Sequence, residues 1–402
     1  MKAEKNIIIL YLAILVNFFI ESFILYFDNR APIILFQTGF NLASVIFILT
    51  KVRKINYPSQ VIYILLITSL VLLFSILSSD IVHSYNMSLK FITPFLYFIA
   101  GYNIINNKFN IIYIFNRLWI IPLFFILNVI TVNTLDIGDS FYKEGIKMGY
   151  MTLNGLYTVF ISLVVLIFFQ FRLKRKKIIH TLLTLASVII FIILLKRTFI
   201  ILLGITFLIL VARNLNVRST LYGLIIATFS FLVIQNYLSE ELSTAVEGRS
   251  SRFSEDYEVT SEGRLTENLL PIVHMKDNYL MYIFGTGEVF NDRPYFEKYY
   301  TLDRELHNSF ARLFWSGGIV LIIVFILFYF SLIRFFYRSF KKLTNKPQTK
   351  YLMYFAFSFA ILRFINEFSS GITYVSYNSM SYLILGGLYF IGEKEMKKPV
   401  KR

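Results

Sequence analysis

Runs of about twenty apolar residues recur along almost the whole chain, and they constrain its fold more than any other feature. A lipid bilayer offers no partner for backbone polar groups, so a segment that crosses it must be a helix or part of a closed barrel. Continuous apolar runs match helices, whereas barrel strands alternate apolar and polar residues. Only 16% of the 402 residues are charged and 56% are hydrophobic, which also indicates a polytopic membrane protein. We therefore expect an all-α membrane protein.

The apolar runs predict about twelve transmembrane helices. The predicted spans are 6–27, 32–50, 60–78, 88–106, 110–133, 150–171, 178–195, 198–212, 219–237, 308–333, 351–370 and 377–392. No internal repeat or Pro-rich linker divides the chain, so we expect residues 1–402 to form a single membrane domain. A long polar segment, 238–306, separates the ninth and tenth spans. So long a segment is rarely structureless, and we expect it to form an external cap loop.

The charges between the spans predict the orientation. The net charge is +16, yet residues 238–306 carry 14 acidic and 7 basic side chains, so the basic excess belongs to the rest of the chain. Most of it falls in short inter-span segments, as expected for cytoplasmic loops. We therefore expect a bacterial cytoplasmic (inner) membrane protein with both termini cytoplasmic and an external, periplasmic active face. Ser79–Asn86 and Lys196-Arg197 then fall on the external side. This distribution argues against nucleic-acid binding.

The residue inventory limits the chemistry. Cysteine is absent and histidine occurs four times, which excludes thiolate catalysis and disfavours a zinc site. The acidic run Glu255–Glu258 fits a solvated loop face better than a divalent ion site. We expect no metal and no cofactor.

His307 is the first candidate for acid–base chemistry. It lies at the external end of the span 308–333, and an imidazole can accept a proton near neutral pH. The alternative is an interfacial histidine exposed to water. Asn308 beside it can bind a hydroxyl or cap the helix. His274, in the middle of the cap loop, is the rival base, although a structural role fits it better.

Arginines on the external side are candidates for phosphate binding, because a guanidinium binds phosphate through two hydrogen bonds. Arg197 lies in a short external turn, where a basic pair departs from the positive-inside pattern. For Arg197 the alternative is a cation that faces lipid headgroups, and for the arginines of the cap loop it is a solvated or ion-paired side chain. The cap loop contributes Arg249, Arg252, Arg264 and Arg304.

Charges inside the predicted spans need partners, because a lone charge in lipid is costly. The four-residue spacing puts Arg363 and Glu367 on one helix face, so mutual neutralisation is the simplest account. Arg117 and Glu21 also need partners. The alternative is that these residues line a path for protons or substrate.

Five short motifs stand out along the chain. In chain order they are Asn154-Gly155, Lys196-Arg197-Thr198, Gly263-Arg264, Gly285-x-Gly287 and His307-Asn308-x-Phe-x-x-Leu-Phe-x-x-Gly-Gly318. Together they resemble the O-antigen polymerase and O-antigen ligase superfamily, and the resemblance extends over essentially the whole chain. That family also places its large external loop between the ninth and tenth helices. Leu153 stands where the family has proline, Lys196 stands where serine is common, and no tryptophan follows Arg264.

The resemblance implies an inverting, metal-independent glycosyl transfer on a glycosyltransferase fold of the C type. The donor would be an oligosaccharide on undecaprenyl pyrophosphate, held in membrane lipid, and a chain-length regulator would be a partner. His307 would take the acceptor's proton, while Arg197 and Arg264 would hold the departing pyrophosphate. Substrate-binding residues would be Arg249, Arg252, Arg304, Asn308 and Asn154.

Several functions stay open on the sequence. We expect a polysaccharide polymerase for O-antigen, capsule or exopolysaccharide, which moves a growing glycan onto the next lipid-linked repeat. A ligase that passes the glycan to lipid A core has the same motifs. A transporter or flippase would instead use Arg363, Glu367 and Arg117, and a structural scaffold would use none of these residues.

Overall fold

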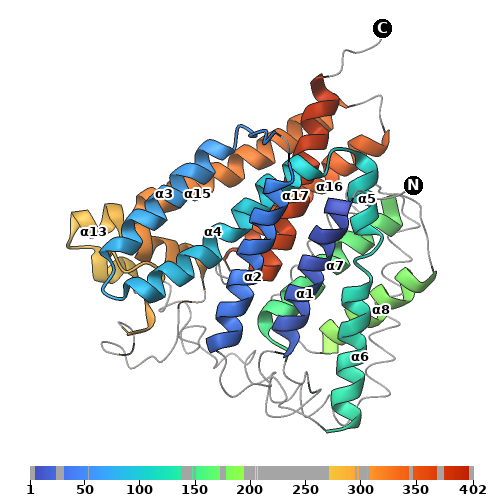
Figure 1. Cartoon of the computed structure of the whole chain (residues 1–402), viewed down its shortest axis with the longest axis horizontal. Helices are drawn as coiled ribbons and strands as arrows, with labels where there is room; N and C mark the ends of the chain where they lie inside the picture. Colours follow the sequence, from blue (N-terminus) through green and yellow to red (C-terminus); the bar gives the residue numbers. More distant parts are fainter. Residues whose placement is uncertain are drawn as a thin grey trace, which may run out of the picture. The chain divides into compact units, whose positions relative to one another are not determined.

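The fold is that of a computed structural model, which describes residues 5–23, 31–52, 54–136, 147, 151–172, 178–193, 204, 206, 271–294, 297, 306, 308–343, 347–368 and 375–397. Throughout these ranges the chain forms helices joined by turns, without a β-strand (Figure 1). The all-α prediction is therefore confirmed for the described residues.

Each predicted span outside 198–237 overlaps one helix, except 110–133, which overlaps two. Residues 198–237 fall almost entirely outside the described ranges. Segments Lys5–Ser22, Lys108–Thr134 and Ser309–Lys342 are long and apolar enough to cross a membrane. A total of about twelve spans stays a prediction. The helices are α1 Lys5–Phe23, α2 Ala31–Thr50, α3 Val61–Leu77, α4 Ile81–Ile104, α5 Lys108–Phe115, α6 Ile120–Thr134, α7 Leu153–Arg172, α8 Ile178–Ile193, α13 Tyr279–Phe284, α15 Ser309–Lys342, α16 Pro347–Asn366 and α17 Val375–Lys397.

Two helix boundaries differ from the sequence prediction. α4 begins at Ile81, inside the segment expected to be an external loop, because Asp80 accepts a hydrogen bond from the His83 backbone (2.9 Å) and caps it. The predicted span 110–133 is divided by a turn at residues 116–119. Arg117 lies in that turn and is exposed. Because the turn falls within Lys108–Thr134, a segment long and apolar enough to cross a membrane, the assignment of Arg117 as an intramembrane charge stays a prediction.

By its internal contacts the chain divides into two units. The second unit contains α6, α7 and α8, which pack on one another, with the rings of Phe125 and Phe191 stacked at 5.3 Å. The first unit contains α1–α5, α13 and α15–α17. A single membrane domain over residues 1–402 stays a prediction. The same holds for the cap loop, since most of residues 238–306 lie outside the described ranges.

Close packing of α4 against α17 forms the centre of the first unit (Figure 1). Glycines allow the two backbones to touch, as small residues do at membrane helix contacts. A Cβ atom on Gly386 would lie 2.0 Å from the Phe98 carbonyl oxygen, and one on Gly101 would lie 2.2 Å from that of Leu383. Phe95 and Phe98 continue the contact by packing on Phe328 of α15.

The helices of the first unit have their termini at two opposite ends of that unit. Hydrogen bonds between neighbouring segments show which termini lie together. At one level Asn103 binds the Asn56 backbone and Lys394 binds the Asn106 carbonyl. We call it the basic end, because nine basic residues lie there, near helix ends or in the connection between α2 and α3: Lys51, Lys54, Lys108, Arg338, Lys341, Lys342, Lys350, Lys394 and Lys397. At the other level, the motif end, Glu288 binds the Ser78 hydroxyl and the Ser309 backbone N–H binds the Glu367 carbonyl.

Candidate functional site

The motif end brings together two of the motifs that are far apart in the sequence. α13 ends at Gly285, whose φ is +83°, and α15 is broken at Gly317 and Gly318. A Cβ atom on Gly285 would lie 2.5 Å from the Gly317 nitrogen, and one on Gly318 would lie 2.3 Å from the Ile283 carbonyl oxygen. The Gly285-x-Gly287 segment therefore packs backbone to backbone against the Gly-Gly break, at a distance that only glycine permits.

The break in α15 frees backbone groups that the loop after α13 binds. The Trp315 carbonyl accepts two hydrogen bonds from Thr286, one from the backbone N–H (2.9 Å) and one from the side-chain hydroxyl (3.0 Å). The Ser316 hydroxyl accepts one from the Phe290 backbone N–H (2.8 Å). Because these groups are satisfied by the loop, the break is a fixed feature of the fold.

Asn308 begins α15 as its N-cap. Its side-chain oxygen accepts hydrogen bonds from the backbone N–H groups of Phe310 (2.8 Å) and Ala311 (3.3 Å), so the capping interpretation is confirmed. The next residue, Ser309, donates its backbone N–H to the Glu367 carbonyl (3.1 Å). This bond fixes the start of α15 against the end of α16.

A buried ion pair, not anticipated from the sequence, joins α15 to the same loop. Arg312 Nη2 lies 3.3 Å from Asp292 Oδ1, with the two side chains 2% and 1% exposed. Arg312 also donates to the Phe290 carbonyl (3.1 Å), and Asp292 accepts the Leu306 backbone N–H (2.5 Å). Arg312 was detectable as a lone charge near the start of an apolar span, but Asp292 resembled any acid of the cap loop.

Glu288 ties the loop to the turn between α3 and α4. Its carboxylate accepts hydrogen bonds from the Ser78 hydroxyl (2.7 Å), the Ser79 backbone (3.0 Å) and the Asn291 amide (3.1 Å). Burial alone would raise the pKa of Glu288, but these hydrogen bonds to the charged form outweigh it, and the pKa lies below the ordinary value of 4.5.

This carboxylate is expected to give the protein a pH-dependent stability. A depressed folded-state pKa stabilises the fold above the unfolded-state pKa, and the contribution is lost as the pH falls through the folded-state value. Glu288→Gln should therefore lower stability at pH 7 by about 0.5–1 kcal/mol, a small value because solvent screens the group. The stability difference between Glu288→Gln and the wild type should decrease as the pH falls from 5 to 3, by about the amount seen at pH 7. Thermal unfolding midpoints of both proteins across that range measure it, and a constant difference would contradict the assignment.

The predicted pairing of Arg363 with Glu367 is confirmed. The Arg363 guanidinium contacts Glu367 Oε1, and both side chains are 1% exposed. Tyr329 donates its hydroxyl to the same oxygen (3.0 Å), and Arg363 also binds Asn378 (2.6 Å) and Tyr377 (2.5 Å). Glu367 Oε2 has no hydrogen-bond partner among the described residues.

A second set of buried polar groups continues from this pair toward the N-terminal helices. Glu21, which the sequence left without a partner, binds the Gln37 amide (2.9 Å) and the Ser376 hydroxyl. The side-chain amides of Asn17 and Asn41 bind each other. Because Ser376 directly precedes Tyr377, the polar groups of α1 and α2 are connected to the Arg363–Glu367 pair through the start of α17.

His274 lies near the broken part of α15. Its ring is 5.6 Å from that of Trp315, at an interplanar angle of 29°, and desolvation lowers its pKa. A lowered pKa keeps the imidazole neutral near pH 7, which fits the structural role expected for it.

Most of the predicted site residues lie outside the described ranges. Of the predicted substrate-binding residues, Asn308 is placed at the motif end, and its role toward substrate stays a prediction. Asn154 lies in the first turn of α7, outside the described side chains. Thr152 caps that turn by accepting a hydrogen bond from the Gly155 N–H (3.3 Å). The predicted residues outside the described ranges are His307, Arg197, Arg264, Arg249, Arg252 and Arg304.

Comparison with known proteins gives no family. No protein-family profile matches the chain, and no curated protein matches it. The function is therefore argued from the residues themselves.

Proposed function

We propose that this chain is a membrane glycosyltransferase that polymerises a lipid-linked polysaccharide. The packing of Gly285-x-Gly287 against Gly317-Gly318 is the observation that carries the proposal. These motifs are two of those that resemble the O-antigen polymerase and ligase superfamily, and they meet at the end where Asn308 begins α15. A shared backbone contact gives a structural reason for the two motifs to occur together.

The distribution of charge supports an external position for the proposed site. Nine lysines and arginines lie at the basic end, and by the positive-inside rule that end would face the cytoplasm. The motif end, which carries Glu288 and the buried Arg312–Asp292 pair, then faces the periplasm. Donor and acceptor on undecaprenyl pyrophosphate would meet there, at the outer surface of the bacterial inner membrane, on a C-type glycosyltransferase fold of about twelve helices.

The proposed chemistry needs a base and cations, and no metal. Pyrophosphate leaves as an anion without taking a proton, so cationic side chains can stabilise it directly. The acceptor hydroxyl must lose its proton as it attacks the anomeric carbon. His307 is the proposed base because its neighbours in the sequence are held at the motif end: Leu306 by Asp292, and Asn308 as the cap of α15. Arg197 and Arg264 are the proposed cations.

Substitution of these three residues tests the proposal. His307→Ala, Arg197→Ala and Arg264→Ala should each reduce polymer formation at least about tenfold, since about 1.4 kcal/mol of lost transition-state stabilisation has that effect. Surface glycans separated on gels, from cells that produce each variant in a deletion background, give the measurement. Arg338→Ala at the basic end is the matched control and should leave chain length unchanged. Normal polymer in the three variants, at normal membrane levels of protein, would refute the assignment.

The alternatives differ in measurable ways. If the protein is a polymerase, a strain that lacks it should accumulate the single-repeat glycolipid. If it is a ligase, such a strain should accumulate the finished polymer on its lipid carrier. A transporter would depend on Arg363 and Glu367 and tolerate His307→Ala. Against transport, both side chains are 1% exposed and the crevice between Glu367, Asn378 and Phe95 has no room for a water molecule.

A further inference from the structure

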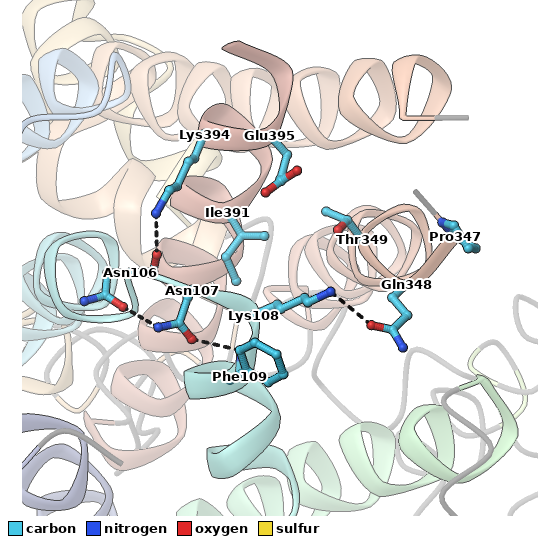
Figure 2. A pocket seen from close by; sticks show the side chains of 10 residues that line it. All are labelled: Asn106, Asn107, Lys108, Phe109, Pro347, Gln348, Thr349, Ile391, Lys394 and Glu395. Carbon is cyan, nitrogen blue, oxygen red and sulfur yellow. Dashed lines mark hydrogen bonds between the residues drawn. The ribbon is translucent and has the colours of Figure 1, made fainter. Parts of the chain in front are cut away.

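A cavity of about 690 Å³ lies at the basic end of the first unit, away from the motif end (Figure 2). Its volume is in the range of small-ligand sites. Three elements surround it: the segment Asn106–Phe109, which leads into α5, the first turn of α16, and the last turns of α17. The proposed glycosyl transfer gives this cavity no role.

Two lysines from different helices reach into the cavity, and both bind neutral oxygens (Figure 2). Lys108 Nζ donates to the Gln348 side-chain oxygen (3.2 Å), and Lys394 Nζ donates to the Asn106 carbonyl (3.1 Å). Within the described ranges neither lysine forms an ion pair with a carboxylate. Glu395 also lines the cavity, so among the residues that the structure describes there, two positive charges face one negative charge.

The N-terminus of α16 adds to the positive potential. α16 begins at Pro347, and its first turn, with Gln348 and Thr349, lines the cavity. The first N–H groups of a helix have no partner within the helix and favour an anion. At the start of α5, Asn107 accepts the Phe109 and Asn110 N–H groups (both 3.0 Å) and caps that helix. The start of α16 is therefore the terminus that faces the cavity together with two lysines.

We propose that this cavity binds the phosphate of an anionic headgroup or phosphate ester. The oxygens would lie between Lys108, Lys394 and the start of α16, where charge-assisted hydrogen bonds are strong. The apolar side chains of Ile391 and Phe109, the latter 46% exposed, would contact the carbon atoms beside the phosphate. A membrane phospholipid and a soluble phosphate are the two possible sources of this group.

A binding experiment on the purified full-length protein in a neutral detergent tests the proposal. Short-chain phosphatidylglycerol, short-chain phosphatidylcholine and inorganic phosphate would each be titrated, with the dissociation constant as the readout. Phosphatidylglycerol is expected to bind more tightly than phosphatidylcholine, and Lys108→Gln/Lys394→Gln should weaken it at least about tenfold. The control pair Lys54→Gln/Lys342→Gln removes the same charge from exposed positions outside the cavity and should weaken binding by less than about threefold.

The outcomes separate the sources of the phosphate. Competition by inorganic phosphate at similar concentration would assign the site to a soluble phosphate, and binding of the lipid alone would assign it to a headgroup. Gln348→Glu, which places a carboxylate beside Lys108 without removing a lysine, should also weaken binding and serves if the double variant is unstable. The proposal would be overturned if the two double lysine variants lost the same amount of affinity. It would also be overturned if neither phosphatidylglycerol nor inorganic phosphate bound.

Discussion

Replacement of Gly318 with alanine is expected to destabilise the protein by more than about 4 kcal/mol, a loss seen only where a substitution has a severe structural cause. Gly318 has a φ of +61°, which disfavours any side chain. Its Cβ atom would also lie 2.3 Å from the Ile283 carbonyl oxygen and 2.6 Å from the Gly285 nitrogen. These are backbone atoms, so α13 and the break in α15 would have to separate.

Gly287→Ala is the matched control for this substitution. Gly287 has a similar φ of +81°, but a Cβ atom there would meet nothing within 4 Å. Its expected cost is only the conformational strain, about 1–2 kcal/mol. The yield of monodisperse protein and its thermal unfolding midpoint in detergent measure both effects. Equal losses would mean that α13 does not pack against the break as described.

Removal of one partner of the Arg363–Glu367 pair is expected to cost about 3–5 kcal/mol, because the remaining charge is left buried without compensation. Glu367→Gln leaves the Arg363 guanidinium without its carboxylate, and Arg363→Met leaves the Glu367 carboxylate without its guanidinium. Both side chains are 1% exposed in the wild type, so the remaining charge is buried. The double variant Arg363→Met/Glu367→Gln should be more stable than either single variant, since it leaves no net buried charge.

The exposed pair Lys397–Glu393 provides the comparison. It has the same four-residue spacing, with an N–O distance of 2.6 Å, but its side chains are 74% and 26% exposed. Lys397→Met should change stability far less than either single substitution in the buried pair, because solvent screens an exposed ion pair. Unfolding midpoints of all four variants give the measurement, and additive losses at Arg363 and Glu367 would exclude the coupling.

The sequence predicted the helices well because a membrane span is decided by local composition. Long apolar runs gave helices at the expected places, and the four-residue spacing of Arg363 and Glu367 was enough to pair them. The predicted helix boundary was wrong at the start of α4, where polar residues face the protein interior. Ser84, which lies in the segment 79–86 that was expected to be a loop, is buried in α4 and donates a hydrogen bond to the Ser78 hydroxyl (2.6 Å).

The candidate site was harder to predict because it depends on contacts between distant segments. The glycine motifs were visible, but their spacing does not reveal that Gly285 touches Gly317. The same holds for Asp292, which binds Arg312 across 20 positions, and for Glu21, which binds Ser376 across 355. Such pairings are properties of the tertiary fold.

The break in α15 also has a consequence for depth in the bilayer. From Ile319 to Arg338 the helix rises about 28 Å at 1.5 Å per residue, close to the thickness of the hydrocarbon layer. With that stretch across the lipid tails and Arg338 among one set of headgroups, the two glycines come level with the opposite set. The eight residues before them, starting at Ser309, then lie where lipid phosphates are found.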